Sequence, residues 1–212
     1  MQISAEIRWF WFEYPPFAFK DWFCKADSHR IAAGGGGLRL DEYMCDRKQV
    51  ELGVKLRGGK KGVEVKGLVS IIENGLEVEP FMGSIEIWTK WSSEILELNL
   101  KETVKTIKRR WLRKFDCFTA EPIEIELDHK ENPKNGATLP SQGCNVELTE
   151  VTLASQDIWW TFGFEAFGTT ETVEENLRKA TTTISKRLHG EFTKGHLASY
   201  PVWLKDYASI KH

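Results

Sequence analysis

The chain has 212 residues, of which 41% are hydrophobic and 28% are charged, and its formal net charge at pH 7 is −2. This composition is typical of a water-soluble globular protein. The near-neutral charge argues against a basic surface of the kind that binds nucleic acid polymers or anionic membranes. Any cationic site must therefore be local, with its charge balanced elsewhere in the chain.

The N-terminal stretch MQISAEIRWFWFEY lacks the basic and apolar regions of a secretory signal. No apolar run approaches the roughly 20 residues that a membrane helix needs. The four cysteines, Cys24, Cys45, Cys117 and Cys144, form no CxxC pair and have no histidine at zinc-ligand spacing, so we do not expect a structural zinc site. These features predict a reduced, cytoplasmic setting and no membrane partner.

Residues 3–12 alternate between apolar and polar side chains, with Ser4, Glu6 and Arg8 on the polar side. A period of two predicts a β-strand, which two prolines then end. Residues 20–25 favour a short helix. The run Gly34–Gly37 predicts a flexible loop; no Gly-Lys-Ser/Thr follows it, so it does not match a phosphate-binding loop.

The clearest pattern is a predicted β-hairpin over residues 50–69. Lys55 and Arg57 share one face of its first arm, and Glu64 and Lys66 share the polar face of its second arm. If this face lines a cavity, the cavity suits a polyanion. If it faces water, it is an ordinary charged surface.

Other segments with a period of two predict further strands. For the cation-rich segment 106–115 we favour a strand over a helix, which places Lys108 and Arg110 on one face. The other predicted strands cover residues 38–45, 83–91, 123–127, 145–152 and 159–167.

An amphipathic helix is predicted near the C-terminus, after a capping box of Thr172 and Glu175. The strands do not alternate with helices, so a parallel sheet is not expected. The sequence predicts one α+β domain over residues 1–212, mainly antiparallel β. We expect an eight- or nine-stranded tunnel-like barrel with a C-terminal helix and few other helices.

Charged residues occur on the polar face of most predicted strands, as a closed barrel with a charged interior would require. Through them the sequence resembles the CYTH superfamily, also called triphosphate tunnel metalloenzymes. The segments that resemble its motifs, in the family's order over nearly the whole chain, are Val54-Lys55-Leu56-Arg57 (LRIR), Glu64-Val65-Lys66 (TLK), Lys108-Arg109-Arg110 (KxR), Phe164-Glu165-Ala166-Phe167 (EIE) and Ser199-Tyr200 (SY).

Two departures from the family pattern each remove a carboxylate. Ser4, Glu6 and Arg8 occupy the positions of the family's ExExK motif, so Ser4 replaces a glutamate while Arg8 keeps the positive charge. In the late EIE motif, Phe167 stands in place of the second glutamate. The metal-binding part of the pattern is therefore the part that is eroded.

The resemblance implies a barrel that binds a triphosphate-containing or polyphosphate small molecule and hydrolyses it with Mg²⁺ or Mn²⁺. Cations neutralise the charge on the phosphoryl oxygens, and carboxylates hold the metal. The implied residues are Arg8, Lys55, Arg57, Lys66, Lys108 and Arg110 for phosphate; Glu6, Glu147 and Glu165 for metal; and Glu6, Lys66 and Glu165 for catalysis.

Two alternatives stay open at this point. The eroded ExExK motif suits a weakly active or inactive binder of a phosphorylated ligand on the same fold. The nine tryptophans and twelve phenylalanines suit a core, or less readily a protein- or glycan-interaction surface. A cyclase acting on ATP would use the same scaffold but has no separate support in the sequence.

Overall fold

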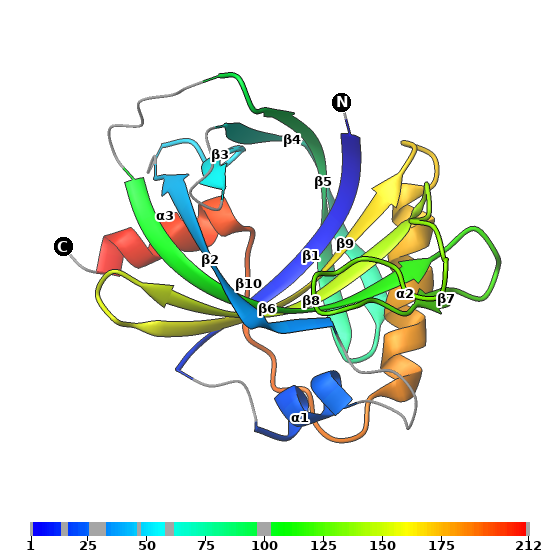
Figure 1. Cartoon of the computed structure of the whole chain (residues 1–212). Coiled ribbons are helices and arrows are strands. Elements are labelled where there is room, and N and C mark those ends of the chain that lie inside the picture. The colour runs from blue at the N-terminus through cyan, green and yellow to red at the C-terminus, as the bar shows by residue number, and fades with distance from the viewer. Residues whose placement is uncertain are drawn as a thin grey trace.

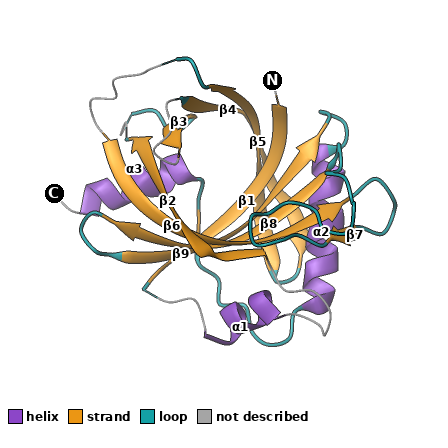
Figure 2. Cartoon of the chain, viewed as in Figure 1, coloured by secondary structure: helices purple, strands orange, loops and turns teal. Residues whose placement is uncertain are grey.

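A computed structural model describes residues 2–13, 17–25, 33–45, 48–57, 62–96 and 103–210. The described part is mostly β-structure, with three helices (Figures 1 and 2). None of these helices is long and apolar enough to cross a membrane. The elements are β1 (Gln2–Phe12), α1 (Phe17–Lys25), β2 (Ala33–Met44), β3 (Leu52–Arg57), β4 (Val63–Val78), β5 (Phe81–Ser93), β6 (Thr103–Asp116), β7 (Ile123–Ile125), β8 (Gly143–Leu153), β9 (Ile158–Gly168), α2 (Val173–Arg187), β10 (His196–Leu197) and α3 (Tyr200–Ile210).

Eight antiparallel strands close into a barrel, in the order β1-β5-β4-β3-β2-β6-β8-β9. Closure comes from ten residue pairs between β1 and β9, the first and last of these strands in the chain. β7 extends the sheet beside β6, and β10 pairs with the end of β1. The predicted antiparallel barrel with a C-terminal helix is therefore confirmed.

The main hydrophobic core lies outside the barrel wall, not inside it. Alternate residues of β1 and β9, such as Trp9 and Phe162, pack in one buried cluster with α1 and α2. The intervening residues of the same strands, such as Glu6 and Glu165, point to the other side of the wall. Because a strand presents successive side chains to opposite faces, covering the outer face with helices leaves the polar face for the interior.

α3 closes one end of the barrel with a second, smaller apolar cluster. Trp203 of α3 stacks on Phe10 of β1, with ring centroids 4.8 Å apart, and Leu204 joins the same buried group. Figure 1 shows α3 on the side of the barrel away from α2. The charged part of the interior is therefore bounded at one end by apolar side chains.

Three local predictions were wrong or incomplete. Gly34–Gly37 lies within β2, where the pairing with β6 shifts register between Gly34 and Leu38; glycine tolerates such irregular strand geometry. Thr172 makes no capping hydrogen bond to α2, because its hydroxyl bonds Thr169. The strands also run further than expected: β4 continues to Val78. Residues 97–102, between β5 and β6, lie outside the described residues.

Truncation of Phe162, which is fully buried on the outer wall, tests this placement of the core. Its ring contacts those of Trp9, Phe19, Phe23 and Phe81. Phe162→Ala should lower the free energy of unfolding by about 3–5 kcal/mol in urea titrations, through lost contacts and a cavity. The control Phe118→Ala, at a site 76% exposed, should change it by about 0.5 kcal/mol or less; equal effects would contradict this core.

Candidate functional site

The barrel encloses a cavity of about 510 Å³ whose lining is strongly charged. Nine lysine and arginine side chains and seven glutamates from the described residues line it. Every residue that the family resemblance implied for phosphate, metal or catalysis is among them: Glu6, Arg8, Lys55, Arg57, Lys66, Lys108, Arg110, Glu147 and Glu165. Strand alternation thus placed all of these side chains on the interior face.

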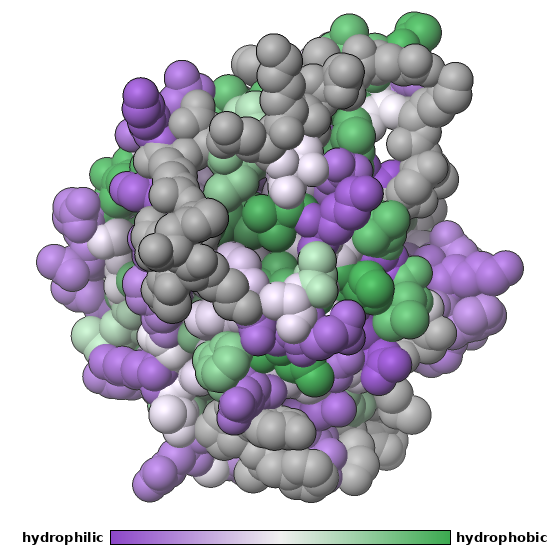
Figure 3. Space-filling view, turned by 90° about the vertical axis from the view of Figure 1, so that its left-hand side faces the viewer, coloured by the Kyte–Doolittle hydropathy of each residue, from purple (hydrophilic) through white to green (hydrophobic). Residues whose placement is uncertain are grey.

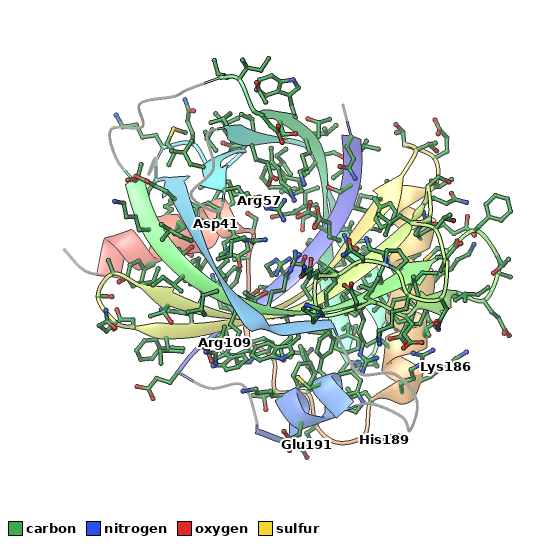
Figure 4. All side chains as sticks on the ribbon, viewed as in Figure 1. Asp41, Arg57, Arg109, Lys186, His189 and Glu191 are labelled. Carbon is green, nitrogen blue, oxygen red and sulfur yellow. The ribbon has the colours of Figure 1, made fainter. Side chains whose placement is uncertain are left out.

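Figure 4 shows the inward and outward directions directly. Asp41 of β2 and Arg57 of β3 lie within the ring of strands, and Arg109 of β6 lies on its outer side. Arg109 makes a loose, exposed ion pair with Glu150 of β8, at 3.8 Å. Its neighbours in sequence, Lys108 and Arg110, line the cavity.

Glu6 and Glu165 lie opposite each other on β1 and β9 and share the ammonium group of Lys66. Nζ of Lys66 is 2.6 Å from Oε1 of Glu6 and 3.2 Å from Oε1 of Glu165. Burial opposes the charge on Lys66, but these two carboxylates outweigh it and raise the pKa of Lys66. Ser4 donates a hydrogen bond to the same Glu6 oxygen at 2.6 Å.

Glu147 of β8 is held between two guanidinium groups. Its Oε2 accepts from Arg8 at 3.1 Å and its Oε1 accepts from Arg110 at 2.8 Å. Burial alone would raise the pKa of Glu147, but the two arginines hold it well below its usual value. Arg110 also bonds Glu131 through Nε, at 3.0 Å, and through Nη2.

Glu64 of β4 faces three cations. Lys55 approaches one of its oxygens at 2.7 Å, and Lys90 and Arg57 approach the other at 3.3 Å and 3.5 Å. Burial would raise the pKa of Glu64, but Lys55 and Lys90 overcome it, and the pKa falls to about 2. One carboxylate therefore balances only part of the positive charge around it.

Asp41 of β2 is fully buried beside two further cations. Its Oδ2 is 3.0 Å from Arg39 and 3.7 Å from Lys108. Lys108 donates to the hydroxyl of Tyr43 at 2.6 Å, and its ammonium lies 3.7 Å from the centre of the Tyr200 ring. Burial, together with repulsion from Lys55, Arg39 and Arg8, holds the pKa of Lys108 well below its usual value.

We define the cation group as Arg39, Lys55, Arg57, Lys90 and Lys108, which surround Glu64 and Asp41. Five cations face two carboxylates, so the group carries a formal charge of +3 when all are ionised. The centre formed by Glu6, Lys66 and Glu165 carries −1 on the same basis. The barrel interior therefore has a positive region at the cation group and a negative region at Glu6, Lys66 and Glu165, although the total charge of the cavity lining is nearly balanced.

Some cavity residues were not among the predicted site residues. Lys114 of β6 lines the cavity and donates a hydrogen bond to Asn145 at 2.6 Å. The alternation of β6 places Lys114 on the same face as Lys108 and Arg110, so the sequence could have predicted that it points inward. Glu131 lies in the loop after β7 and reaches Arg110. No periodicity marks a loop residue, so the sequence carried no signal for Glu131.

The carboxylates do not fit a divalent metal site in this arrangement. Such an ion needs several free oxygen ligands, whereas Glu6, Glu165 and Glu147 already bond ammonium or guanidinium groups. Within the described ranges, no group of three or more His, Cys, Asp or Glu side chains is placed to hold a metal ion.

Comparison with known proteins adds no identification, because no family model and no curated protein matches this sequence.

Gly163 of β9 leaves the space that the Arg8 guanidinium occupies. A Cβ atom at this position would lie 2.9 Å from Cζ of Arg8. Gly163→Ala should displace Arg8 from Glu147 and lower the free energy of unfolding by about 1–3 kcal/mol. Gly67→Ala, where the nearest atom is 3.5 Å away, is the control; similar losses in both variants would contradict the assigned role.

The lowered pKa of Glu64 predicts how stability changes in acid. Because its pKa is about 2 in the folded protein against an ordinary 4.5, its ionised form stabilises the fold above pH 4.5, and this contribution disappears as the pH falls toward 2. The contribution is on the order of 3 kcal/mol. In urea titrations over this range, Glu64→Gln should lose stability less steeply than the wild-type protein; parallel slopes would contradict the pKa.

Proposed function

We propose that this protein binds a triphosphate-containing or polyphosphate small molecule inside its barrel. The observation that supports the proposal best is the cation group, in which five cavity-lining cations face only two carboxylates, Glu64 in the cavity and the buried Asp41. An anionic ligand placed there relieves the repulsion among these cations and gains charge-assisted hydrogen bonds from them.

The chemistry of the cation group suits phosphate oxygens. Arg39 and Arg57 supply guanidinium groups that donate two parallel hydrogen bonds to phosphate, and Lys55 and Lys90 supply compact ammonium groups. Lys55 lies between Glu64 and Tyr43, at 2.7 Å from the carboxylate and 5.7 Å from the ring centre. Lys55 also interacts electrostatically with Asp41 and Lys108, so a ligand bound at Lys55 lies near the cations that surround Glu64 and near those that surround Asp41.

The resemblance to triphosphate tunnel metalloenzymes supports the same ligand class. The residues that this resemblance implies for phosphate binding lie on β1, β3, β4 and β6, and all of them line the same cavity. A cytoplasmic location and the absence of a nucleic acid polymer as partner remain parts of the proposal.

Metal-dependent hydrolysis of the bound triphosphate, with Mg²⁺ or Mn²⁺, is the second candidate function. It rests on the family resemblance, and it requires Glu6, Glu147 and Glu165 to exchange their ammonium and guanidinium partners for the metal ion. The assay is phosphate release from tripolyphosphate and from ATP with each metal. Turnover that depends on Glu6 and Lys66 supports it; turnover that survives Glu6→Ala and Lys66→Ala contradicts it.

A protein- or glycan-interaction surface has less support. Exposed apolar residues such as Leu38, Ile95 and Phe118 are spread over different elements and loops. On the face seen in Figure 3, hydrophobic side chains lie in small groups among hydrophilic ones. A broad continuous apolar patch would be expected of such a surface.

Isothermal titration calorimetry with tripolyphosphate tests the binding proposal. We expect the wild-type protein to bind, and Lys55→Met to bind about 10- to 100-fold more weakly because a charge-assisted contact is lost. Lys186→Met is the control, because Lys186 lies on α2, outside the barrel (Figure 4). An absence of wild-type binding, or equal losses in both variants, would contradict the proposal.

A further inference from the structure

The two glutamates that the family resemblance implied as metal ligands already share a cation of the protein itself. Lys66 projects from β4, two strands away from β1 in the barrel. Its Nζ lies 2.6 Å from Glu6 and 3.2 Å from Glu165. The ammonium group therefore occupies the space between two carboxylates where a bound cation would bridge them.

We propose that Lys66 is a built-in counter-ion that takes the place of a divalent metal at Glu6 and Glu165, so that the barrel binds its anionic ligand without metal. The identity of this ligand rests on the proposed function, whereas the replacement of a metal ion by an ammonium group rests on the contacts of Lys66 with Glu6 and Glu165.

The surroundings of Glu6 and Glu165 support this assignment. Ser4, which stands where the family pattern has a glutamate, donates a hydrogen bond to Glu6 at 2.6 Å. A hydroxyl in place of a third carboxylate lowers the negative charge at this point, which weakens attraction for a doubly charged ion. With Ser4 in place of the family's glutamate, the centre of Glu6, Glu165 and Lys66 carries −1, whereas the family pattern of three glutamates and one lysine would carry −2.

The third implied ligand is also satisfied without metal. Each oxygen of Glu147 accepts from a different arginine, Arg8 at 3.1 Å and Arg110 at 2.8 Å. A metal at Glu147 would have to displace guanidinium groups that cannot lose their charge. The same ion would then face Arg8 and Arg110 at close range, which is electrostatically unfavourable.

Titration with Mn²⁺ alone, followed by electron paramagnetic resonance of the free ion, tests the claim without any phosphate ligand. We expect the wild-type protein to leave the free Mn²⁺ signal unchanged. Lys66→Met keeps the aliphatic stem but removes the charge, so Glu6 and Glu165 become available and the variant should bind Mn²⁺. Lys90→Met is the matched control, a cavity lysine beside Glu64, and should gain no Mn²⁺ site.

Binding of Mn²⁺ by the wild-type protein would overturn the proposal, and so would a folded Lys66→Met variant that gains no site. If Lys66→Met fails to fold, the wild-type protein gives the answer through tripolyphosphate titrations in EDTA and in Mg²⁺. Affinity in EDTA at least equal to that in Mg²⁺ supports the proposal; a tenfold gain from Mg²⁺ overturns it. If the wild-type protein binds tripolyphosphate in neither buffer, the proposed function is rejected instead. The Mn²⁺ titration of the wild-type protein then decides the role of Lys66.

Discussion

The structure depends on pairing charges inside a closed β-barrel. Unpaired charges in such an enclosed space are costly, and they are tolerated when an opposite charge and hydrogen bonds compensate them. Glu147 between two arginines and Lys66 between two glutamates meet this requirement. Since the interior is polar, the apolar faces of β1, β8 and β9 are buried on the outside of the wall, where α1 and α2 cover them.

Positive and negative groups are not matched one to one inside the barrel, and this mismatch connects the fold to a function. Glu64 and Asp41 face more cations than they neutralise, while Glu6 and Glu165 share a single ammonium. The strands of the barrel wall project these groups into one cavity, so their like charges stay close to one another. An anionic ligand can relieve it, and in this sense the cavity is organised for a ligand before one arrives.

Alternation alone predicted which side chains share a face, as for Lys55 and Arg57 in the hairpin, and the resemblance to a charged barrel predicted that this face points inward. It could not predict which charges meet. Lys66 and Glu6 are 60 residues apart, and their contact follows from barrel closure and strand register, which local periodicity does not encode. Glu131 reaches the cavity from a loop, and the register shift within Gly34–Gly37 depends on pairing with β6. The side of each strand was therefore predictable, but the network between strands was not.

On this view, a charged cavity within the barrel holds a polyanion against its cations. Lysine acetylation followed by mass spectrometry, with and without tripolyphosphate, measures this residue by residue. We expect tripolyphosphate to protect Lys55 and Lys90, which line the cavity, and to leave the reactivity of Lys186 on α2 unchanged. Equal modification of Lys55 and Lys90 with and without tripolyphosphate would contradict it.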